Sequence, residues 1–339
     1  GMEERLGDLA ACGIVACRDG GDRHAYTMQY KRDHLDRNVF PLQLKVAGAA
    51  WHQHGRYGKM IGKSPGPLKK LAQSISNQIR GIDHIKIVNS GLNSLVCFGK
   101  ETPPQFDVME LKGAVAIGKH FCCKTMDHAN GKEKVEIALK AGCHSIEHGF
   151  FMGEENLERM AEKQIFWVPT AVTMKACRDA FERRIRNPGW RNRSADPSIL
   201  RVSEMAQGAS RNLEHQLEQI RRAKELGVPI AIGTDAGSIG VHHGRSLKEE
   251  IRLFMTAGFS VPGAIQCATL NNARLLNIDG YGVIAEGAPA TFIVASGSPQ
   301  DLPDSLDSLT SLYIEGKEIA KRKTQNDKPR HGQYQRLKS

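Results

Sequence analysis

The sequence is poor in aromatic residues and has neither a long apolar run nor a C-x-x-C pair of cysteines. Only 6% of its 339 residues are aromatic, whereas 40% are hydrophobic and 25% are charged, which is typical of an ordinary globular protein and excludes a disordered or collagen-like chain. No apolar run approaches the roughly 20 residues that cross a bilayer, so we expect no membrane partner. The N-terminal residues lack the features of a signal peptide. Eight cysteines without C-x-x-C spacing indicate reduced thiols and a cytoplasmic location.

Acidic residues are outnumbered, but the excess positive charge is concentrated at one end of the chain. The 47 Lys and Arg residues against 37 Asp and Glu residues leave a net charge of +10. Residues 321–339 contain seven Lys or Arg and one Asp, so they carry six of these ten charges and leave four for the rest. This segment lacks apolar periodicity, which predicts a disordered basic tail. Because the remaining charge is small, no nucleic-acid partner is expected.

Short apolar runs alternate with longer amphipathic stretches from residue 13 to about residue 276. The runs predict strands at residues 13–17, 42–46, 84–88, 122–128, 143–147, 165–168 and 230–233. The stretches predict helices at residues 67–80, 107–119, 132–141, 154–163, 198–226 and 247–257. Several stretches end at a glycine such as Gly142 or Gly227, which tolerates the left-handed position after a helix. This alternation is typical of a parallel sheet with crossover helices.

Seven strand–helix units are one short of a closed TIM-type (β/α)8 barrel. We therefore predict an α/β fold of this type that lacks its first strand, with barrel strands two to eight in residues 1–276. From residue 277 the pattern changes to short strands and glycine turns, which predicts a small β-sandwich portion over residues 277–320 before the tail at 321–339. A barrel without one strand has two unpaired edges, which favour association into a homo-oligomer.

Four side chains suited to catalysis or metal binding lie in or just after four of the predicted strands. Lys86 is flanked by two isoleucines, and His128, His148 and Asp235 each end or follow an apolar run. Reactive groups of parallel α/β barrels gather at the C-terminal ends of the strands. Each residue alone has a structural explanation, since a buried Lys can extend its amine to solvent along an apolar surface. Their joint occurrence predicts a single site.

These residues stand within motifs that resemble those of the amidohydrolase superfamily, particularly its imidazolonepropionase-like and prolidase-like members. The resemblance extends from about residue 13 to residue 317. The matching motifs, in chain order, are RDGG at 18–21, GIDHIK at 81–86, HANG at 128–131, AGCHSIEHG at 141–149, WVPT at 167–170, GVPIAIGTDAG at 227–237, HG at 243–244, EE at 249–250, ATLNNA at 268–273 and IEGK at 314–317.

The resemblance implies a role for each of the four residues. Lys86 matches the lysine that these enzymes carboxylate with CO2 to bridge two divalent metals, and burial would leave its amine free to react. His128 and His148 match ligands of the second metal, and imidazole suits Zn²⁺. Asp235 matches a ligand of the first metal that also shuttles protons, which places Asp235 and His148 at the catalytic centre. The implied cofactors are one or two divalent ions, with zinc favoured, and a carbamate on Lys86.

The implied reaction is hydrolysis of an amide carbon–nitrogen bond by a metal-activated water. Asp235 would take the proton from this water and pass it to the leaving nitrogen. Tyr57 and His243 are expected on loops over the substrate. Cyclic amides, dipeptides and N-acyl amino acids are the small-molecule substrates that the resemblance suggests.

One motif of the family has no counterpart where the family has it. The first metal is held by a His-x-His at the end of strand one, and that strand would fall before residue 1. The sequence contains a His-x-His at His52-Gln53-His54, which follows the third barrel strand and is interpreted as a loop feature. Lys86, His128 and His148 would still hold the second metal. The alternative function is therefore a truncated or degenerate barrel that binds a ligand or partner without turnover.

The segment from His144 to His148 also fits the H-x-x-E-H motif of a group of zinc peptidases. That motif needs a helix, in which residues four apart lie one turn from each other. Here Gly142 ends a predicted helix and a strand follows, so the two histidines would lie about 13 Å apart at ~3.3 Å per residue. This separation is too large for one ion, and we interpret His144 as a structural residue.

Overall fold

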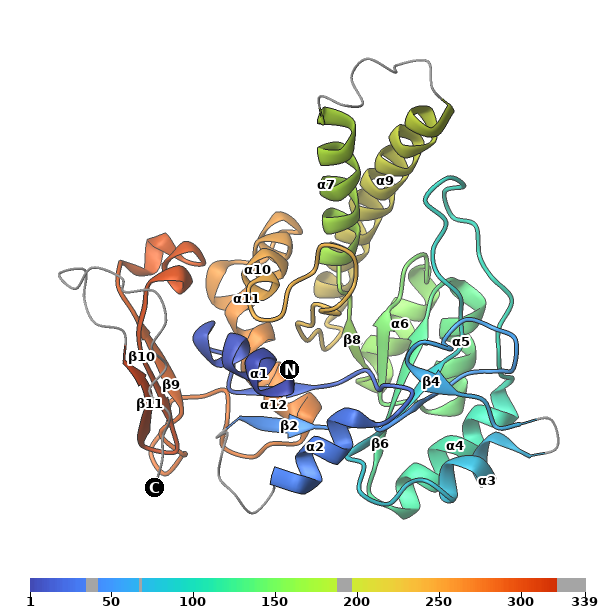
Figure 1. Ribbon diagram of the computed structural model, residues 1–339, viewed down its shortest axis with the longest axis horizontal. Coiled ribbons are helices and arrows are strands. Elements are labelled where there is room, and N and C mark those ends of the chain that lie inside the picture. The colour runs from blue at the N-terminus through green and yellow to red at the C-terminus, as the bar shows by residue number, and fades with distance from the viewer. Residues whose placement is uncertain (35–41, 67–68, 188–196, 322–339) are drawn as a thin grey trace.

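The computed structural model describes residues 1–34, 42–66, 69–187 and 197–321. A six-stranded parallel sheet forms the main body (Figure 1). Its strands are, in spatial order, β4 (Gly62–Lys63), β3 (Ala50–Trp51), β5 (His84–Val88), β6 (Lys124–Ala129), β7 (Ser145–His148) and β8 (Phe166–Val168). The parallel α/β architecture predicted from the sequence is confirmed.

Further strand segments extend this sheet toward a barrel. The short strands β1 (Ala16–Arg18) and β2 (Gln43–Lys45) pair in parallel, and the Asp83 amide, just before β5, donates to the carbonyl of Val46 at 2.8 Å. At the other edge, Trp167 of β8 pairs with Ile230, so the strand expected at 230–233 is reduced to one isolated bridge. Within the described ranges, no ladder joins Ile230 to β1.

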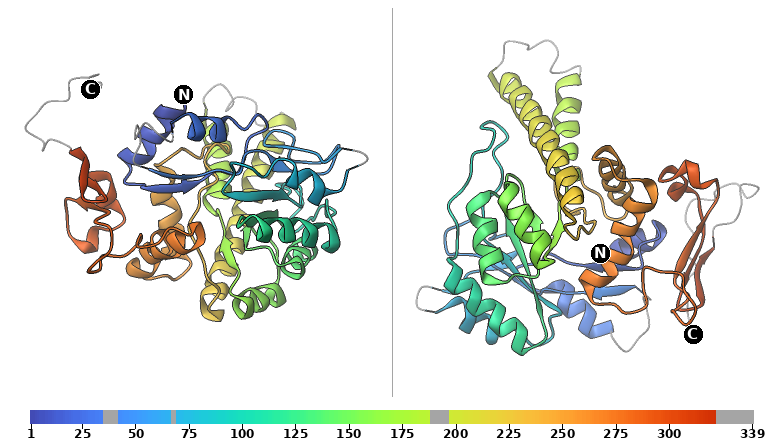
Figure 2. Two further views of the ribbon diagram at one scale, coloured as in Figure 1. Left: turned by 90° about the horizontal axis from the view of Figure 1, so that it is seen from below. Right: turned by 180° about the vertical axis from the view of Figure 1, so that it is seen from behind.

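Helices follow the strands and cover the outer face of the sheet (Figure 2). Those packed along β5–β8 are α3 (Leu71–Ser76), α4 (Val108–His120), α5 (Lys132–Ala141) and α6 (Glu154–Lys163). α5 and α6 have the predicted bounds, and α5 ends at Gly142, whose φ of 85° is the left-handed conformation that glycine adopts without strain. α4 begins where the Asp107 side chain accepts a hydrogen bond from the Glu110 amide at 2.8 Å, a standard helix cap.

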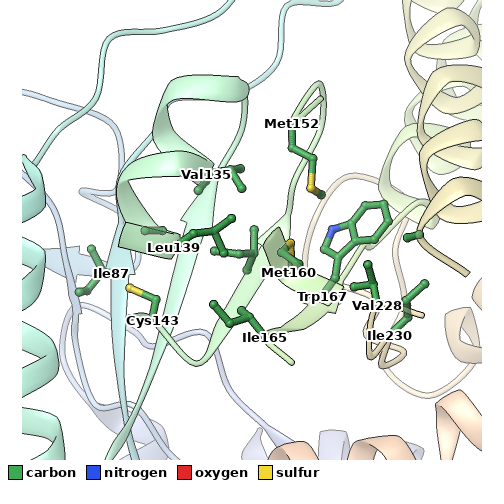
Figure 3. Packing of buried hydrophobic residues seen from close by; sticks show 14 of the residues in the cluster. Ile87, Val135, Leu139, Cys143, Met152, Met160, Ile165, Trp167, Val228 and Ile230 are labelled. Carbon is green, nitrogen blue, oxygen red and sulfur yellow. The ribbon is translucent and has the colours of Figure 1, made fainter. Parts of the chain in front are cut away.

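The main core lies between this sheet and its helices. Figure 3 shows Ile87 of β5 and Trp167 of β8 with Val135 and Leu139 of α5 and Met160 of α6, all of them buried. Burial of each such side chain contributes about 1.5–3 kcal/mol to folding. This packing fixes the strands, and therefore the positions of the residues at their C-terminal ends.

Two long helices project from the body side by side (Figures 1 and 2). They are α7 (Val172–Arg186), which follows β8, and α9 (Pro197–Leu226), which has 30 residues. The sequence predicts α9 but not α7. The chain then returns through α10 (Ser246–Thr256), α11 (Val261–Ala268) and α12 (Leu270–Leu276). None of the helices in the described ranges combines the length and the apolar character needed to cross a membrane.

A small antiparallel sheet lies at the side of the body, in the order β11 (Lys317–Lys321), β10 (Leu309–Ile314) and β9 (Phe292–Ala295). A second apolar cluster joins it to α1 (Met2–Ala11) and β2, beside α2 (Tyr26–His34), and its buried members are Leu6, Leu42, Leu312 and Ile314. The domain limits at 276 and 320 stay predictions. The predicted disordered tail lies outside the described residues beyond Lys321.

Candidate active site

Lys86 lies in the middle of β5 with only 4% of its surface exposed. An ammonium group in such a place loses most of its hydration, so burial lowers the pKa of Lys86, and the charge of Arg18 acts in the same direction. The charges of Glu147, Asp235 and Asp127 partly oppose this shift. Lys86 therefore has a larger neutral fraction than an exposed lysine, and a neutral amine is the form that reacts with electrophiles.

His128 at the end of β6 and His148 at the end of β7 lie next to each other, with ring centroids 4.5 Å apart. Burial, together with the charge of Lys86, lowers the pKa of His148 to about 3. Burial also lowers the pKa of His128 well below its usual value, with further contributions from His148 and Lys86. Both imidazoles are therefore neutral near pH 7, which is the form that binds metal ions.

Each of these two rings uses one nitrogen in a hydrogen bond. Nε2 of His128 lies 3.3 Å from the carbonyl oxygen of Gly91, and Nδ1 of His148 lies 2.7 Å from the hydroxyl oxygen of Thr170. In the described part of the chain, the second nitrogen of each ring has no hydrogen-bond partner. One nitrogen of each histidine thus remains open to a ligand.

Asp235 lies after the Ile230 bridge, with a φ of 54° and an exposed side chain. Ser238 donates its hydroxyl to Oδ2 of Asp235 at 2.7 Å. The charge of Asp235 acts on Lys86 and on His128, so all three lie around one region. The structure therefore places His128 and His148 side by side near Lys86, which lies in the middle of β5. Asp235 lies within electrostatic range of Lys86 and His128, but in the described residues it does not complete a metal-binding group with the two histidines.

Tyr57 and His243, the two expected substrate-binding residues, have different surroundings. The Tyr57 ring lies 5.5 Å from the His128 ring, and burial together with the charge of Asp235 raises the pKa of Tyr57. The charged groups that act on His243 are Arg5, Asp8 and His242, which places it against α1. Tyr57 thus borders the four-residue site, and a substrate role for His243 stays a prediction.

The loop that carries Tyr57 also contains the His-x-His sequence. His52 is buried, with Nδ1 2.8 Å from the carbonyl oxygen of Gln53, whereas His54 is exposed. The loop faces an open cavity of about 340 Å³. The residues that line this cavity are Gly55, Arg56, Tyr57, Gly91, Thr102, Pro103 and Gln105. The cavity adjoins the site through Tyr57 and through Gly91, whose carbonyl contacts His128.

A buried ion pair near Lys86 is not predicted from the sequence. Arg18 of β1 donates from Nη2 to Oε1 of Glu147 on β7 at 2.6 Å and also to the Ser145 hydroxyl at 3.2 Å. The hydroxyl of Ser145 in turn donates to the same Oε1 at 2.7 Å. β1 and β7 are not neighbours in the sheet, so this pair connects two separated strands. Its only sequence signal is that Ser145 and Glu147, two residues apart, share one face of a strand.

Asp127, next to His128 on β6, is a second residue that the sequence analysis missed. Strand alternation directs it to the opposite face from His128, and it is completely buried. Neither of its carboxylate oxygens has a hydrogen-bond partner. Burial raises the pKa of Asp127 to about 8, while the charge of Lys86 opposes the shift. Its sequence signal is weak, because β6 also contains the polar residues Lys124, Thr125 and His128.

Across the described ranges, no group of three or more His, Cys, Asp and Glu side chains has the arrangement of a metal site.

His144 is not part of a peptidase motif, because β7 is a strand. Nδ1 of His144 lies 3.0 Å from the amide nitrogen of Thr125. The strand geometry and this hydrogen bond agree with the structural role predicted for His144.

Residues 44–324 of this chain match the sequence model of the amidohydrolase family. Ochratoxinase from Aspergillus niger is 27% identical over 262 residues, which are 72% of this chain and 49% of that protein. An uncharacterized protein of Mycobacterium tuberculosis is 22% identical over 249 residues, which are 73% of this chain and 61% of that protein. The chain therefore spans between about half and three fifths of the length of these curated relatives.

Solved structures share the fold. A Xaa-Pro dipeptidase with bound methionine in its active site aligns with a TM-score of 0.73 and 24% identity, over 93% of this chain and 77% of that one. The ochratoxinase structure aligns with a TM-score of 0.74 and 20% identity, over 94% of this chain and 75% of that one. These alignments confirm the predicted TIM-barrel type of fold. Because the family's sequence model matches most of its length, this chain belongs to the amidohydrolase family.

Proposed function

We propose that this chain is a metal-dependent hydrolase of amide bonds, in which Lys86, His128 and His148 hold a divalent ion and Asp235 transfers protons. Members of the family generally use a divalent metal. The observation that carries the proposal is the convergence of a buried lysine of lowered pKa, two adjacent neutral histidines and an accessible carboxylate. Perturbed titratable groups of this kind cluster at catalytic sites.

The donor chemistry of these side chains fits a zinc-like ion. His128 and His148 each offer one unpartnered ring nitrogen, and imidazole nitrogen is a common zinc ligand. The neutral amine of Lys86 can add to CO2: its lone pair forms the nitrogen–carbon bond, one proton leaves to solvent, and the resulting carbamate anion offers oxygen donors. The carbamate on Lys86 is needed as a donor because the described residues contain no group of three or more His, Cys, Asp and Glu side chains that could hold a metal ion.

The remaining steps depend on side chains that the structure describes. A divalent ion held by Lys86, His128 and His148 would lower the pKa of bound water and polarise a carbonyl group. Ser238 occupies Oδ2 of Asp235, which leaves Oδ1 to accept a proton and to deliver it to the leaving nitrogen. Tyr57 lines the cavity with its ring 5.5 Å from the His128 ring, and its hydroxyl is the proposed hydrogen-bond donor for the substrate.

The proposed substrates are small amides: dipeptides, N-acyl amino acids or cyclic amides. The cavity of about 340 Å³ suits a molecule of this size. Relatives with the same fold are named as an ochratoxinase and a Xaa-Pro dipeptidase, which supports this range. Within the described residues no two cysteines form a disulfide, which supports the proposed cytoplasmic location. The unpaired sheet edges support the proposed homo-oligomer.

Lys86→Ala tests the metal site directly. Purified protein is incubated with Zn²⁺ and bicarbonate, its metal content is measured by mass spectrometry, and hydrolysis of a panel of dipeptides and N-acyl amino acids is assayed. We expect Lys86→Ala to lose both metal and activity, because it removes the carbamate. Lys140→Ala, a half-exposed lysine of α5, is the matched control and keeps both.

Two outcomes contradict the proposal. Full metal retention in Lys86→Ala shows that Lys86 is a structural residue. Less than about a tenth of an equivalent of metal in the unmodified protein, without amidase activity, favours the degenerate barrel that binds without turnover.

A further inference from the structure

The chain bends sharply after β8, and the bend contacts the candidate active site. Thr170, at this bend, is 3% exposed and has a φ of 50°. Such a left-handed conformation is an outlier for a β-branched residue and is strained. The hydroxyl oxygen of Thr170 lies 2.7 Å from Nδ1 of His148. A strained residue at the edge of a site persists only where its surroundings impose the conformation.

Two completely buried side chains from distant helices impose this conformation. The carboxylate of Glu250 on α10 accepts hydrogen bonds from the amides of Ala171 at 2.9 Å and Val172 at 2.6 Å, the two residues that follow Thr170. On α9, Gln216 donates from Nε2 to the carbonyl of Pro169 at 3.0 Å. The backbone is therefore held on both sides of Thr170.

The same Gln216 amide also holds His148. Its Nε2 donates to the carbonyl of His148 at 2.5 Å, and Nε1 of Trp167 donates to that carbonyl at 3.0 Å. His148 has a φ of 67°, so both partners of the Thr170–His148 contact are in left-handed conformations that the same glutamine stabilises. The separation between the Thr170 hydroxyl and the imidazole is thus fixed by the backbone and not only by side-chain rotamers.

We propose that Thr170 is a positioning residue that fixes the ring orientation and the tautomer of His148. Nδ1–H of His148 donates to the Thr170 hydroxyl oxygen, and the unprotonated Nε2 faces Lys86 and His128. The neutral ring carries one proton. The Lys86 amine, which has N–H groups to donate in either protonation state, or a metal ion on the site side favours a lone pair there over an N–H. The metal-ligand role of Nε2 rests on the proposed function, whereas the tautomer itself does not.

His144 provides an internal reference for this tautomer. Its Nδ1 lies 3.0 Å from the backbone nitrogen of Thr125 and 3.1 Å from the Thr125 hydroxyl. A backbone N–H can only donate, so Nδ1 of His144 is an acceptor and its proton resides on Nε2. The Thr125–His144 and Thr170–His148 pairs therefore place the imidazole proton on opposite nitrogens.

The test compares Thr170→Val, Thr170→Ser and Thr125→Val. Imidazole ¹⁵N chemical shifts are recorded by NMR on the metal-free full chain near pH 7, and Zn²⁺ affinity is measured by titration with the metal alone. We expect Thr170→Val to lose the Nδ1–H signature of His148 and to bind Zn²⁺ about 10–100-fold more weakly. Thr170→Ser keeps the hydroxyl and retains both properties. Thr125→Val, the matched control, changes only the signals of His144.

The unmodified protein alone can overturn the inference: a His148 proton on Nε2 excludes it, even if Thr170→Val does not fold. An unchanged His148 tautomer in folded Thr170→Val also excludes it. Absence of Zn²⁺ binding by the unmodified protein contradicts the proposed function instead, because the tautomer is read without metal.

Discussion

Lys86, Asp127 and His128 lie on two adjacent strands, and burial moves all three toward their neutral forms. Lys86 and His128 benefit from this, because a neutral amine and a neutral imidazole are the reactive and ligating forms. Asp127 gains no such function from its neutral form. It is buried on the other face of the strand, and neither of its carboxyl oxygens has a hydrogen-bond partner. Of these three residues, Lys86 and His128 belong to the candidate site, whereas Asp127 only titrates.

Asp127 makes stability depend on pH. In the unfolded chain a carboxyl group ionises near pH ~4, whereas the folded chain keeps Asp127 protonated until its pKa of about 8. The unfolded state thus loses the proton first, and the free energy of unfolding falls as pH rises from about 4 to about 8. We expect Asp127→Asn to reduce this slope, as measured by urea unfolding at pH 5 and pH 8. The exposed Asp279→Asn serves as control, and an unchanged slope in Asp127→Asn contradicts the assignment.

At the scale of elements, the site depends on contacts between strands and helices that are far apart in sequence. Arg18 joins β1 to β7, Gln216 joins α9 to the residues after β7 and β8, and Glu250 joins α10 to the start of α7. Each contact satisfies a buried polar group that would otherwise destabilise the fold. The positions of the strand ends are therefore set by these polar contacts as well as by the apolar core.

Arg18→Met tests the connection between β1 and β7. It leaves the Glu147 carboxylate buried without its cation, which we expect to cost about 3–5 kcal/mol in the free energy of unfolding measured with urea. The double variant Arg18→Met, Glu147→Leu removes both charges and should recover most of this loss. A single-variant cost below about 1 kcal/mol, the range of exposed pairs, shows that the ion pair does not stabilise the fold.

Periodicity predicted most of these elements from sequence. The strand at 84–88 and the helices at 132–141 and 154–163 have the expected bounds, because their apolar residues repeat with a clear period. The strand at 230–233 was overestimated, since an apolar run indicates burial but not hydrogen-bonded pairing. The helix at 172–186 was missed because its mixture of Thr, Cys and Arg gives a weak pattern.

The candidate site was predictable where it depends on position along a strand. Lys86, His128 and His148 lie in or at the end of strands, and chain order alone places such residues on one rim. The Arg18–Glu147 pair joins residues 129 positions apart, and a single sequence contains no signal for that distance. Partners of this kind are defined only by the folded backbone.

At the scale of the whole molecule, two apolar clusters stabilise different parts. One lies between the parallel sheet and its helices, and the other joins α1, β2 and the antiparallel sheet of β9–β11. Leu312 belongs to the second cluster and Leu157 to the first. Because their buried neighbours differ, damage to one cluster should remain largely local.

Leu312→Ala tests this separation. We expect it to cost about 2–5 kcal/mol locally and to speed amide hydrogen exchange in α1 and β9–β11, while β5–β8 stay protected. Leu157→Ala should give the reverse pattern. Uniformly faster exchange in both variants means that the two clusters unfold as one cooperative unit.

The single amide of Gln216 that binds the carbonyls of both Pro169 and His148 has a consequence for protein engineering. Barrel enzymes are often diversified by grafting one catalytic loop at a time, on the assumption that each loop is an independent module. Here the segments after β7 and β8 share one hydrogen-bond donor, the Gln216 amide on α9. A graft that replaces either segment must therefore also replace the residues of α9 that contact it. Substitutions in either segment at this rim therefore have to be matched on α9.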